Sequence, residues 1–345
     1  MKKVCVVGHF GFGKELLNGQ TIKAKAVTAE LERQLGSEQV KKIDTHGGMR
    51  ALPRVLRQLF GAFCHCENIV ILPAHNGIRV FAPLCAALCR MFHRKLHYVV
   101  IGGWLADYLH SHRRVAKALH RFTGIYVETS TMQRALEALG YQNVFLMPNF
   151  KNLQILSENE LISSEKEPHR LCTFSRVMKE KGIEDAVNAV NSINEKYGRT
   201  VFTLDIFGQV DSEQTQWFEE LKASFPVYIH YRGLVPFDQS VSVLKDYFAL
   251  LFPTKFYTEG IPGTILDAYC AGIPVISARW ESFADVVDNG ITGIGYEFGN
   301  QEALLQVLHR IAQKPNEITD MKRNCIAAAG RYLPANALQV ILREM

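Results

Sequence analysis

The feature that most constrains this chain is an alternation of short apolar runs with longer amphipathic segments. The runs Asn68–Leu72 (NIVIL) and His97–Ile101 (HYVVI) are examples, and similar runs occur along both halves of the sequence. A strand with one solvated face alternates polar and apolar residues, whereas a continuously apolar strand is buried on both faces. Such strands separated by helical segments predict parallel sheets with helices on both sides.

Each half of the chain carries five predicted strands. In the first half they are Lys3–Val7, Asn68–Leu72, His97–Ile101, Ile125–Glu128 and Val144–Met147. In the second half they are Arg170–Phe174, Thr200–Phe207, Val227–Arg232, Phe248–Phe252 and Pro274–Ser277. The polar stretch Lys151–Pro168 separates the halves, and 345 residues are too many for one ordinary core. We therefore predict an α/β chain of two Rossmann-like domains.

Charge and composition narrow the functional classes. Residues 1–148 hold 20 Lys/Arg against 9 Asp/Glu, whereas residues 149–345 hold 19 against 25. The basic half favours an anionic partner, either lipid headgroups or nucleic acid. The eight cysteines show no zinc spacing, so we expect no metal site and a reducing, cytoplasmic compartment. The N-terminal run reads as a buried strand rather than a signal peptide, and no run reaches the ~20 apolar residues of a membrane span.

Two strand-to-helix turns in the second half carry unusual chemistry. Pro253–Thr264 follows one predicted strand and opens a predicted helix, whose free N–H groups suit a diphosphate. Glu259 lies before this helix, and Asp267 lies eight positions later on its second turn. Arg176 and Lys181 flank the turn after another strand, where two cations also suit a diphosphate.

Together these turns resemble the retaining glycosyltransferases of family 4. The spacing Glu259-x7-Asp267 resembles the E-x7-E motif of that family, with Asp267 one methylene shorter than the usual Glu, and Cys270–Ile276 resembles its trailing run. Arg176 to Gly182 resembles its GR-x4-KG element. The resemblance implies a GT-B fold, in which two Rossmann-like domains face each other across a cleft. The implied domains are an acceptor domain at 1–150, a nucleotide-sugar domain at 151–330 and a C-terminal helix at 331–345 that packs back on the first domain.

The resemblance also implies roles for individual residues. Glu259 would contact the donor sugar, Arg176 and Lys181 would bind the donor phosphates and stabilise the leaving group, and Asp267 would bind the ribose. The other implied donor-binding residues lie in turns that resemble those of the family: Gly19, Gln20, Gly208, Gly233, Val235, Ile261, Pro262, Gly263 and Thr264.

The acceptor side departs from the family pattern. Many members carry a His after the fourth strand of the first domain, where this chain has Gly102, Gly103 and Trp104. The glycines allow a close backbone approach, and Trp104 offers a ring on which a sugar can stack. We therefore expect His75, Gly103 and Trp104 on the acceptor side, with a satisfied structural His as the alternative for His75.

The implied activity is retaining transfer of a hexosyl unit from a nucleoside-diphosphate sugar, with a UDP-sugar favoured. The acceptor would be a glycan or a lipid-linked sugar in polysaccharide biosynthesis, and the nucleotide-sugar is a substrate, so no cofactor is expected. Met49–Phe63 is basic and amphipathic, which favours an anionic membrane surface and a cytoplasmic protein peripheral to the inner face of the cell membrane.

Two other functions fit parts of the sequence. A sugar-nucleotide epimerase of the same fold would use the same donor motif. A basic nucleic-acid-binding protein would use the first half, but the basic residues lack interleaved aromatic platforms, and the donor motif would be unexplained. We therefore expect no nucleic-acid partner.

Overall fold

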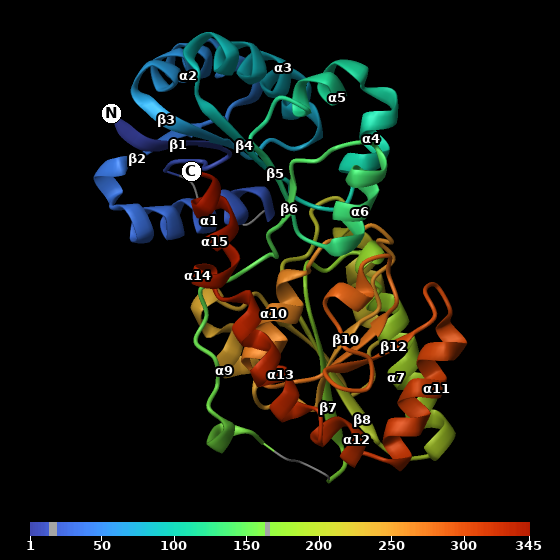
Figure 1. The fold of residues 1–345 in the computed structure, drawn as a ribbon. Coiled ribbons are helices and arrows are strands. Elements are labelled where there is room, and N and C mark those ends of the chain that lie inside the picture. Colours follow the sequence, from blue (N-terminus) through green and yellow to red (C-terminus); the bar gives the residue numbers. More distant parts are fainter. Residues whose placement is uncertain (14–18, 163–165) are drawn as a thin grey trace. The chain divides into compact units, whose positions relative to one another are not determined.

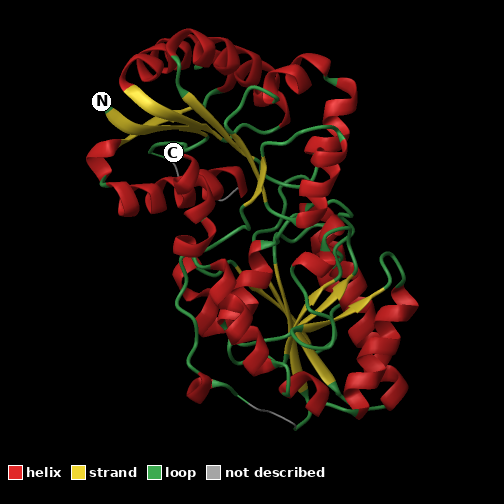
Figure 2. Cartoon of the chain, in the orientation of Figure 1, coloured by secondary structure: helices red, strands yellow, loops and turns green. Residues whose placement is uncertain are grey.

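A computed structural model of the chain describes residues 1–13, 19–162 and 166–345. The chain divides into two compact units (Figure 1). Unit 1 consists of Met1–Asn152 and Leu333–Met345, and unit 2 of Leu153–Tyr332. Each unit contains one six-stranded sheet whose paired strands are all parallel, and helices surround each sheet (Figure 2). The predicted α/β fold with two Rossmann-like units is confirmed. Residues 14–18 of the predicted first loop and residues 163–165 of the predicted boundary lie outside the described ranges.

The sheet of unit 1 has the strand order β2-β1-β3-β4-β5-β6. Its strands are β1 (Lys2–Gly8), β2 (Val40–Asp44), β3 (Cys66–Ile71), β4 (Lys95–Val99), β5 (Gly124–Val127) and β6 (Val144–Leu146). Its helices are α1 (Gly19–Leu35), α2 (Leu52–His65), α3 (His75–Phe92), α4 (Leu105–Ser111), α5 (Arg113–Leu119), α6 (Ser130–Ala138), α14 (Pro334–Ala337) and α15 (Gln339–Glu344). The strand order reverses between β1 and β3, and ligands of open parallel sheets bind beyond the carboxyl ends of the strands at such a reversal.

Alternate residues of β1 face the two sides of this sheet. Cys5 and Val7 are buried in the core formed with α2, α3 and α5. Val4 and Val6 are buried in the core formed with α1, α14 and α15. This two-sided burial explains the continuously apolar sequence of the strand.

The C-terminal segment belongs to unit 1. Helix α14 contacts α1, and α15 contacts β5. The ammonium group of Lys95 donates hydrogen bonds to the backbone carbonyls of Glu344 and Met345, at 2.9 and 3.3 Å. Residues of α14 and α15 are therefore buried in the same core as Val4 and Val6 of β1.

The sheet of unit 2 has the strand order β12-β11-β10-β7-β8-β9. Its strands are β7 (His169–Phe174), β8 (Phe202–Phe207), β9 (Ile229–Gly233), β10 (Ala249–Phe252), β11 (Val275–Ala278) and β12 (Gly293–Tyr296). Its helices are α7 (Ile183–Tyr197), α8 (Thr215–Ala223), α9 (Ser240–Leu244), α10 (Gly263–Cys270), α11 (Gln301–Gln313), α12 (Asn316–Thr319) and α13 (Lys322–Ala329). Here the order reverses between β7 and β10, so the loops after these two strands meet at the expected ligand edge.

Two strands were absent from the sequence prediction, and both lie at sheet edges. Strand β2 reads VKKID, and three of its five residues are charged, which edge strands tolerate better than central ones. Strand β12 reads GIGY, and its two glycines give it a low strand propensity. Neighbouring strands, rather than local sequence, decide that these segments are extended.

In the described part of the chain, no helix is both long enough and apolar enough to cross a membrane.

The side chain of Asn194 connects helix α7 to strand β8. It is buried, its oxygen accepts hydrogen bonds from the backbone N–H groups of Val201 and Phe202 at 2.9 and 3.0 Å, and its amide donates to the Phe202 carbonyl at 2.9 Å. We expect Asn194→Ala to lower the free energy of unfolding by about 2–4 kcal/mol, because buried backbone groups lose their partners. Asn188→Ala, at an exposed position of the same helix, should change it by less than about 0.5 kcal/mol in the same urea titration. Equal effects of the two substitutions would contradict this assignment.

Candidate active site

An ion pair lies where the loops after β7 and β10 meet. Lys181 ends a short 3₁₀ turn (Lys179–Lys181), and its ammonium group pairs with the carboxylate of Glu259 from the β10–α10 loop. Their side chains are only 18% and 16% exposed. The hydroxyl of Thr254 donates a hydrogen bond to the same carboxylate oxygen at 3.2 Å. The structure therefore brings together two residues that the sequence assigned to the donor site from separate motifs.

Aromatic rings surround the ammonium group of Lys181. It lies 5.5 Å from the ring centroid of Phe252 and 4.9 Å from that of Phe256, both within cation–π range. Rings on two sides limit water around the charge, and charge–charge interactions are stronger where water is limited. The position is therefore suited to stabilise a second anionic group close to Glu259.

A glycine makes this approach of the two loops possible. Gly182 follows Lys181 directly and has a positive φ of 70°. A side-chain carbon at Gly182 would collide with the backbone carbonyl oxygen of Pro253 in the β10 loop. The N–H of Lys255 also donates to the Glu180 carbonyl at 2.8 Å, so the two loops are held together through their backbones.

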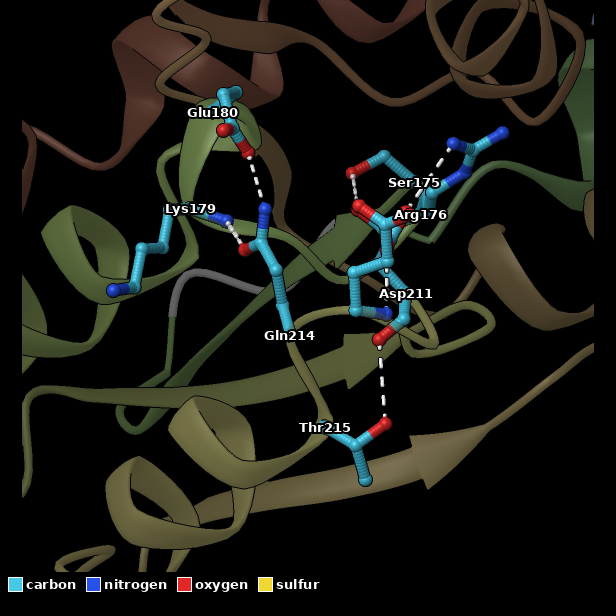
Figure 3. A network of polar contacts seen from close by, with 8 residues as sticks. Ser175, Arg176, Lys179, Glu180, Asp211, Gln214 and Thr215 are labelled. Atoms are coloured by element: carbon cyan, nitrogen blue, oxygen red, sulfur yellow. Dashed lines mark hydrogen bonds and ion pairs between the residues drawn. The ribbon is translucent and has the colours of Figure 1, made fainter.

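Arg176 is directed to a different partner. Its guanidinium group lies 3.4 Å from the carboxylate of Asp211, in the loop after β8 (Figure 3). Next to it, Gln214 accepts from the N–H of Lys179 at 2.8 Å and donates to the Glu180 carboxylate at 2.9 Å. Arg176 is exposed and thus available to an anionic ligand, but it makes no contact with Glu259 among the interactions found in the described residues. Sequence reasoning missed Asp211 and Gln214, although both follow the turn at Gly208.

The amino terminus of α10 lies in the same loop region. Ile261 and Pro262 are buried, Gly263 begins the helix, and the hydroxyl of Thr264 is a buried oxygen without a hydrogen-bond partner in the described structure. The first N–H groups of a helix carry a partial positive charge and have no partners within the helix. Together with the Thr264 hydroxyl they form a set of donors suited to phosphate oxygens.

Asp267 occupies a different environment from the one that the resemblance implies. Its side chain is buried, and one of its oxygens accepts a hydrogen bond from the Ser240 hydroxyl at 2.9 Å. The ribose contact of Asp267 therefore stays a prediction, and its observed partner is Ser240 at the start of α9.

The loops after β7, β8 and β9 interlock through glycines. Gly208 has φ 133°, its N–H donates to the Gly233 carbonyl at 2.9 Å, and a side chain there would collide with the carbonyl oxygen of Ser175. The hydroxyl of Tyr231 donates to the Gly208 carbonyl at 2.9 Å. Val235 follows Gly233 and packs partly buried against the core of α9 and α10. The predicted nucleotide-side turns are thus adjacent to one another.

Unit 1 carries the predicted acceptor-side residues. His75 begins α3 and stacks on Trp104 with ring centroids 3.7 Å apart, and Gly103 precedes Trp104 in the β4–α4 loop. Partial burial lowers the pKa of His75 from its ordinary value, which favours the neutral ring. Gly19 begins α1, and the amide of Gln20 donates to the Leu72 carbonyl at the end of β3, at 3.2 Å.

A polar cluster that the sequence did not reveal shapes the first loop of unit 1. Asp44, at the end of β2, accepts hydrogen bonds from the backbone N–H groups of residues 10, 11, 12 and 46. Burial opposes ionisation of Asp44, but these four donors outweigh it and lower its pKa. His9 lies between Thr21 and His46, at 2.8 and 3.1 Å, and burial and the neighbouring His46 lower its pKa. The cluster escaped prediction because strand β2 itself did.

Within the described ranges, no group of three or more His, Cys, Asp or Glu side chains is arranged to hold a metal ion.

Comparison with known proteins finds a family match within the second half of the chain. Residues 168–314, less than half of the chain, match the family Glycosyl transferases group 1. The chain is similar to the amylovoran biosynthesis glycosyltransferase AmsK of Erwinia amylovora, with 20% identity over 151 residues. This alignment covers 43% of the chain and 37% of AmsK, little more than a third of that relative's length.

Solved structures share the whole fold. HepE from Anabaena in complex with UDP has a TM-score of 0.76 at 14% identity, over 99% of both chains. Sucrose-phosphate synthase from Thermosynechococcus elongatus has a TM-score of 0.74 at 14% identity, over 99% of this chain and 98% of that one. The likeness at this identity concerns the fold, an α/β fold of two domains of the GT-B class. The group 1 match supports a glycosyltransferase domain at residues 168–314.

The close approach at Gly182 can be separated from its backbone conformation. Gly182 and Gly198 both have positive φ, 70° and 63°, but a side chain at Gly198 would meet open space. We expect Gly198→Ala to lower the free energy of unfolding by roughly 1–2 kcal/mol, the cost of a left-handed Ala. Gly182→Ala should cost about 1–3 kcal/mol more, because the added carbon displaces the β10 loop. Chemical denaturation of both variants measures the difference, and equal losses would show that the loops are not in tight contact.

Proposed function

We propose that this chain is a retaining glycosyltransferase that moves a hexosyl unit from a UDP-sugar to an acceptor hydroxyl in polysaccharide biosynthesis. The observation that carries the proposal is the partly desolvated Lys181–Glu259 pair at the β7/β10 reversal, beside the amino terminus of α10. A cation, an acid and free helix N–H groups at this edge match the needs of a donor whose diphosphate leaves with negative charge.

In the proposed reaction, the bond between the anomeric carbon and the donor phosphate oxygen breaks. A bond from the acceptor oxygen to the same carbon forms with retained configuration, and the acceptor proton leaves with the nucleoside diphosphate. Lys181, Arg176 and the N–H groups at Gly263 and Thr264 stabilise the charge that develops on the departing phosphate. Glu259 accepts hydrogen bonds from the sugar hydroxyls.

The ion pair would change partners during this reaction. Lys181 and Glu259 neutralise each other in the structure. An arriving diphosphate offers Lys181 a more strongly charged partner, and Glu259 can then turn to the neutral sugar. Because Lys181 and Glu259 are already positioned together, little side-chain rearrangement is needed when the sugar is transferred.

The comparisons supply the support for the donor and the pathway. HepE has been solved with UDP and with UDP-glucose, and AmsK is named for amylovoran biosynthesis. Similar folds and a shared domain favour a UDP-sugar and a polysaccharide product for this chain as well.

Substitutions in the ion pair test this function. With UDP-glucose as donor probe, we expect Lys181→Ala and Glu259→Gln each to lower the rate of UDP release by roughly 10²–10³-fold, because transition-state stabilisation is lost. Lys179→Ala is the matched control, since Lys179 is exposed two residues away and its ammonium group lies over Trp217. Coupled UDP detection gives the rates, and NMR of the product gives the anomeric configuration.

The same assays distinguish the rival function. Unchanged rates in folded Lys181→Ala and Glu259→Gln variants would refute the proposed site. Conversion of UDP-glucose to an epimer without UDP release would instead indicate an epimerase. An inverted product would contradict the retaining course while leaving the transferase intact.

We further propose that unit 1 binds an anionic bilayer, which would place the enzyme peripherally at the inner face of the cell membrane with a glycan or lipid-linked acceptor. Arg113, Arg114 and Lys117 of α5 are exposed on unit 1. Arg54 and Arg57 are exposed on the amphipathic helix α2. Basic groups near a membrane surface contribute about 1 kcal/mol each with anionic lipids.

Vesicle flotation tests the membrane proposal. We expect flotation with phosphatidylglycerol vesicles but not with phosphatidylcholine vesicles, and a loss of flotation as ionic strength rises. Changing Arg113, Arg114 and Lys117 to Glu should abolish it. The control changes Lys196, Lys222 and Lys314 of unit 2 to Glu, which are also exposed and give the same net charge. Equal loss in both variants would show that net charge alone, rather than a face of unit 1, governs binding.

A further inference from the structure

A cavity of about 430 Å³ lies in unit 1, lined by Thr45 just after β2, by Pro73 and Ala74 just after β3, and by Gln20 of α1. Helices α2 and α3 supply apolar walls at Leu52, Val55, Val80 and Phe81, and Gln20 and His75 lie among the polar lining residues. This volume falls within the usual range of small-molecule sites, which are also mostly apolar with a few polar groups. The reversal of strand order at β1 and β3 is the expected ligand edge of this sheet.

An exposed apolar strip continues from this cavity along the two helices. Leu52 lines the cavity, and Leu56 and Phe60 follow at four-residue spacing on α2 with 37% and 51% exposure. Residues at this spacing lie on one side of a helix. On α3, Val80 lines the cavity and is 41% exposed, and Met91 is 58% exposed. We call Leu52, Leu56, Phe60, Val80 and Met91 the α2/α3 strip.

The far ends of the two helices also meet. The ring of Phe60 packs edge to face on Phe92 at the end of α3, with centroids 5.4 Å apart. The strip therefore runs along both helices instead of being a set of scattered exposed residues, and α2 and α3 lie side by side over the same face of the sheet (Figure 1). Continuous exposed apolar surface is uncommon on monomeric proteins unless something binds there.

The charges beside the strip all have one sign. Arg54 and Arg57 are exposed on α2, and Arg79 is exposed on α3 next to Val80. Neither helix contains an Asp or a Glu. The Arg54 guanidinium donates hydrogen bonds to the backbone carbonyls of Asp44 and His46, and no carboxylate of the described residues forms an ion pair with it. The matching ligand is therefore apolar along most of its length and anionic at one end.

We propose that the cavity and the α2/α3 strip bind one molecule of a lipid phosphate, which deepens the proposed function by naming the acceptor as a lipid-phosphate-linked sugar. The cavity takes the part of the chain nearest the phosphate, the strip takes the more distant part, and the arginines pair with the phosphate. The inference rests on the proposed function for the sugar at the end of this lipid. It differs from bilayer binding, because a single lipid molecule suffices to occupy the site.

Short-chain lipid phosphates test the site without a membrane. We expect full-length protein to bind farnesyl phosphate below its critical micelle concentration in isothermal calorimetry, and to bind inorganic phosphate at least roughly tenfold more weakly. Dodecyl phosphate distinguishes the source of the lipid: equal affinity indicates any lipid phosphate, and weaker affinity indicates a branched prenyl chain. Failure of both amphiphiles to bind as monomers would overturn the proposal and leave only bilayer or protein docking for the strip.

Matched variants locate the binding. Val80→Asp should weaken farnesyl phosphate binding by roughly tenfold or more, because a carboxylate enters an apolar wall and repels the phosphate. Val227→Asp is the control, since Val227 is 91% exposed and lies in unit 2. Equal affinities of these two variants would overturn the site. Circular dichroism and thermal melting establish that both are folded.

A second pair of variants tests the charge and separates this inference from the proposed function. Arg54→Gln with Arg57→Gln should bring farnesyl phosphate affinity down toward the Val80→Asp level, whereas Lys196→Gln with Lys314→Gln should leave it unchanged. UDP binding by each variant reports the donor site separately. Intact UDP binding and sugar transfer without lipid binding would refute this inference alone. Lipid binding by wild-type protein that shows no transferase activity, with the same lipid affinity in Lys181→Ala, would refute the proposed transferase alone.

Discussion

The candidate active site depends on one backbone contact, the approach of the β7 and β10 loops at the reversal of strand order in unit 2. Gly182 permits it because only a residue without a side chain fits against the carbonyl of Pro253. The contact places Lys181 and Glu259 together, with aromatic rings around the ammonium group. The helix that follows the β10 loop then presents its amino terminus at the same edge, so position and charge follow from the same packing.

Unit 1 also has a reversal of strand order, but different types of side chain surround it. Its reversal also lies at the carboxyl ends of neighbouring strands, but the groups around it are apolar walls, stacked rings and arginines rather than an ion pair. The half-buried carboxylate of Asp44 organises the backbone of the first loop here. This division of chemistry fits a fold in which one unit holds an anionic donor and the other an amphiphilic acceptor, as we propose.

Most of the fold followed from the sequence because central parallel strands are apolar on both faces, as β3, β5 and β10 are. The edge strands β2 and β12 do not, since one is charged and the other glycine-rich. Because β2 was not predicted from the sequence, Asp44 at its end and the neighbouring cavity residue Thr45 were not predicted as part of a site. Among site residues, the motif spacing led to Lys181 and Glu259. The same spacing suggested a ribose contact for Asp267, which the structure places inside the domain against Ser240.

The sequence by itself determined the alternation of strands and helices, the glycines at the tight turns and the residue types at the strand ends, because these depend on local periodicity and backbone sterics. Only the tertiary structure decided which of those residues meet. Lys181 and Glu259 are 78 positions apart, and Arg176 turns to Asp211 from another loop. Such pairings depend on the order of strands in the sheet, which sets the neighbours of each loop and is not encoded in any local pattern.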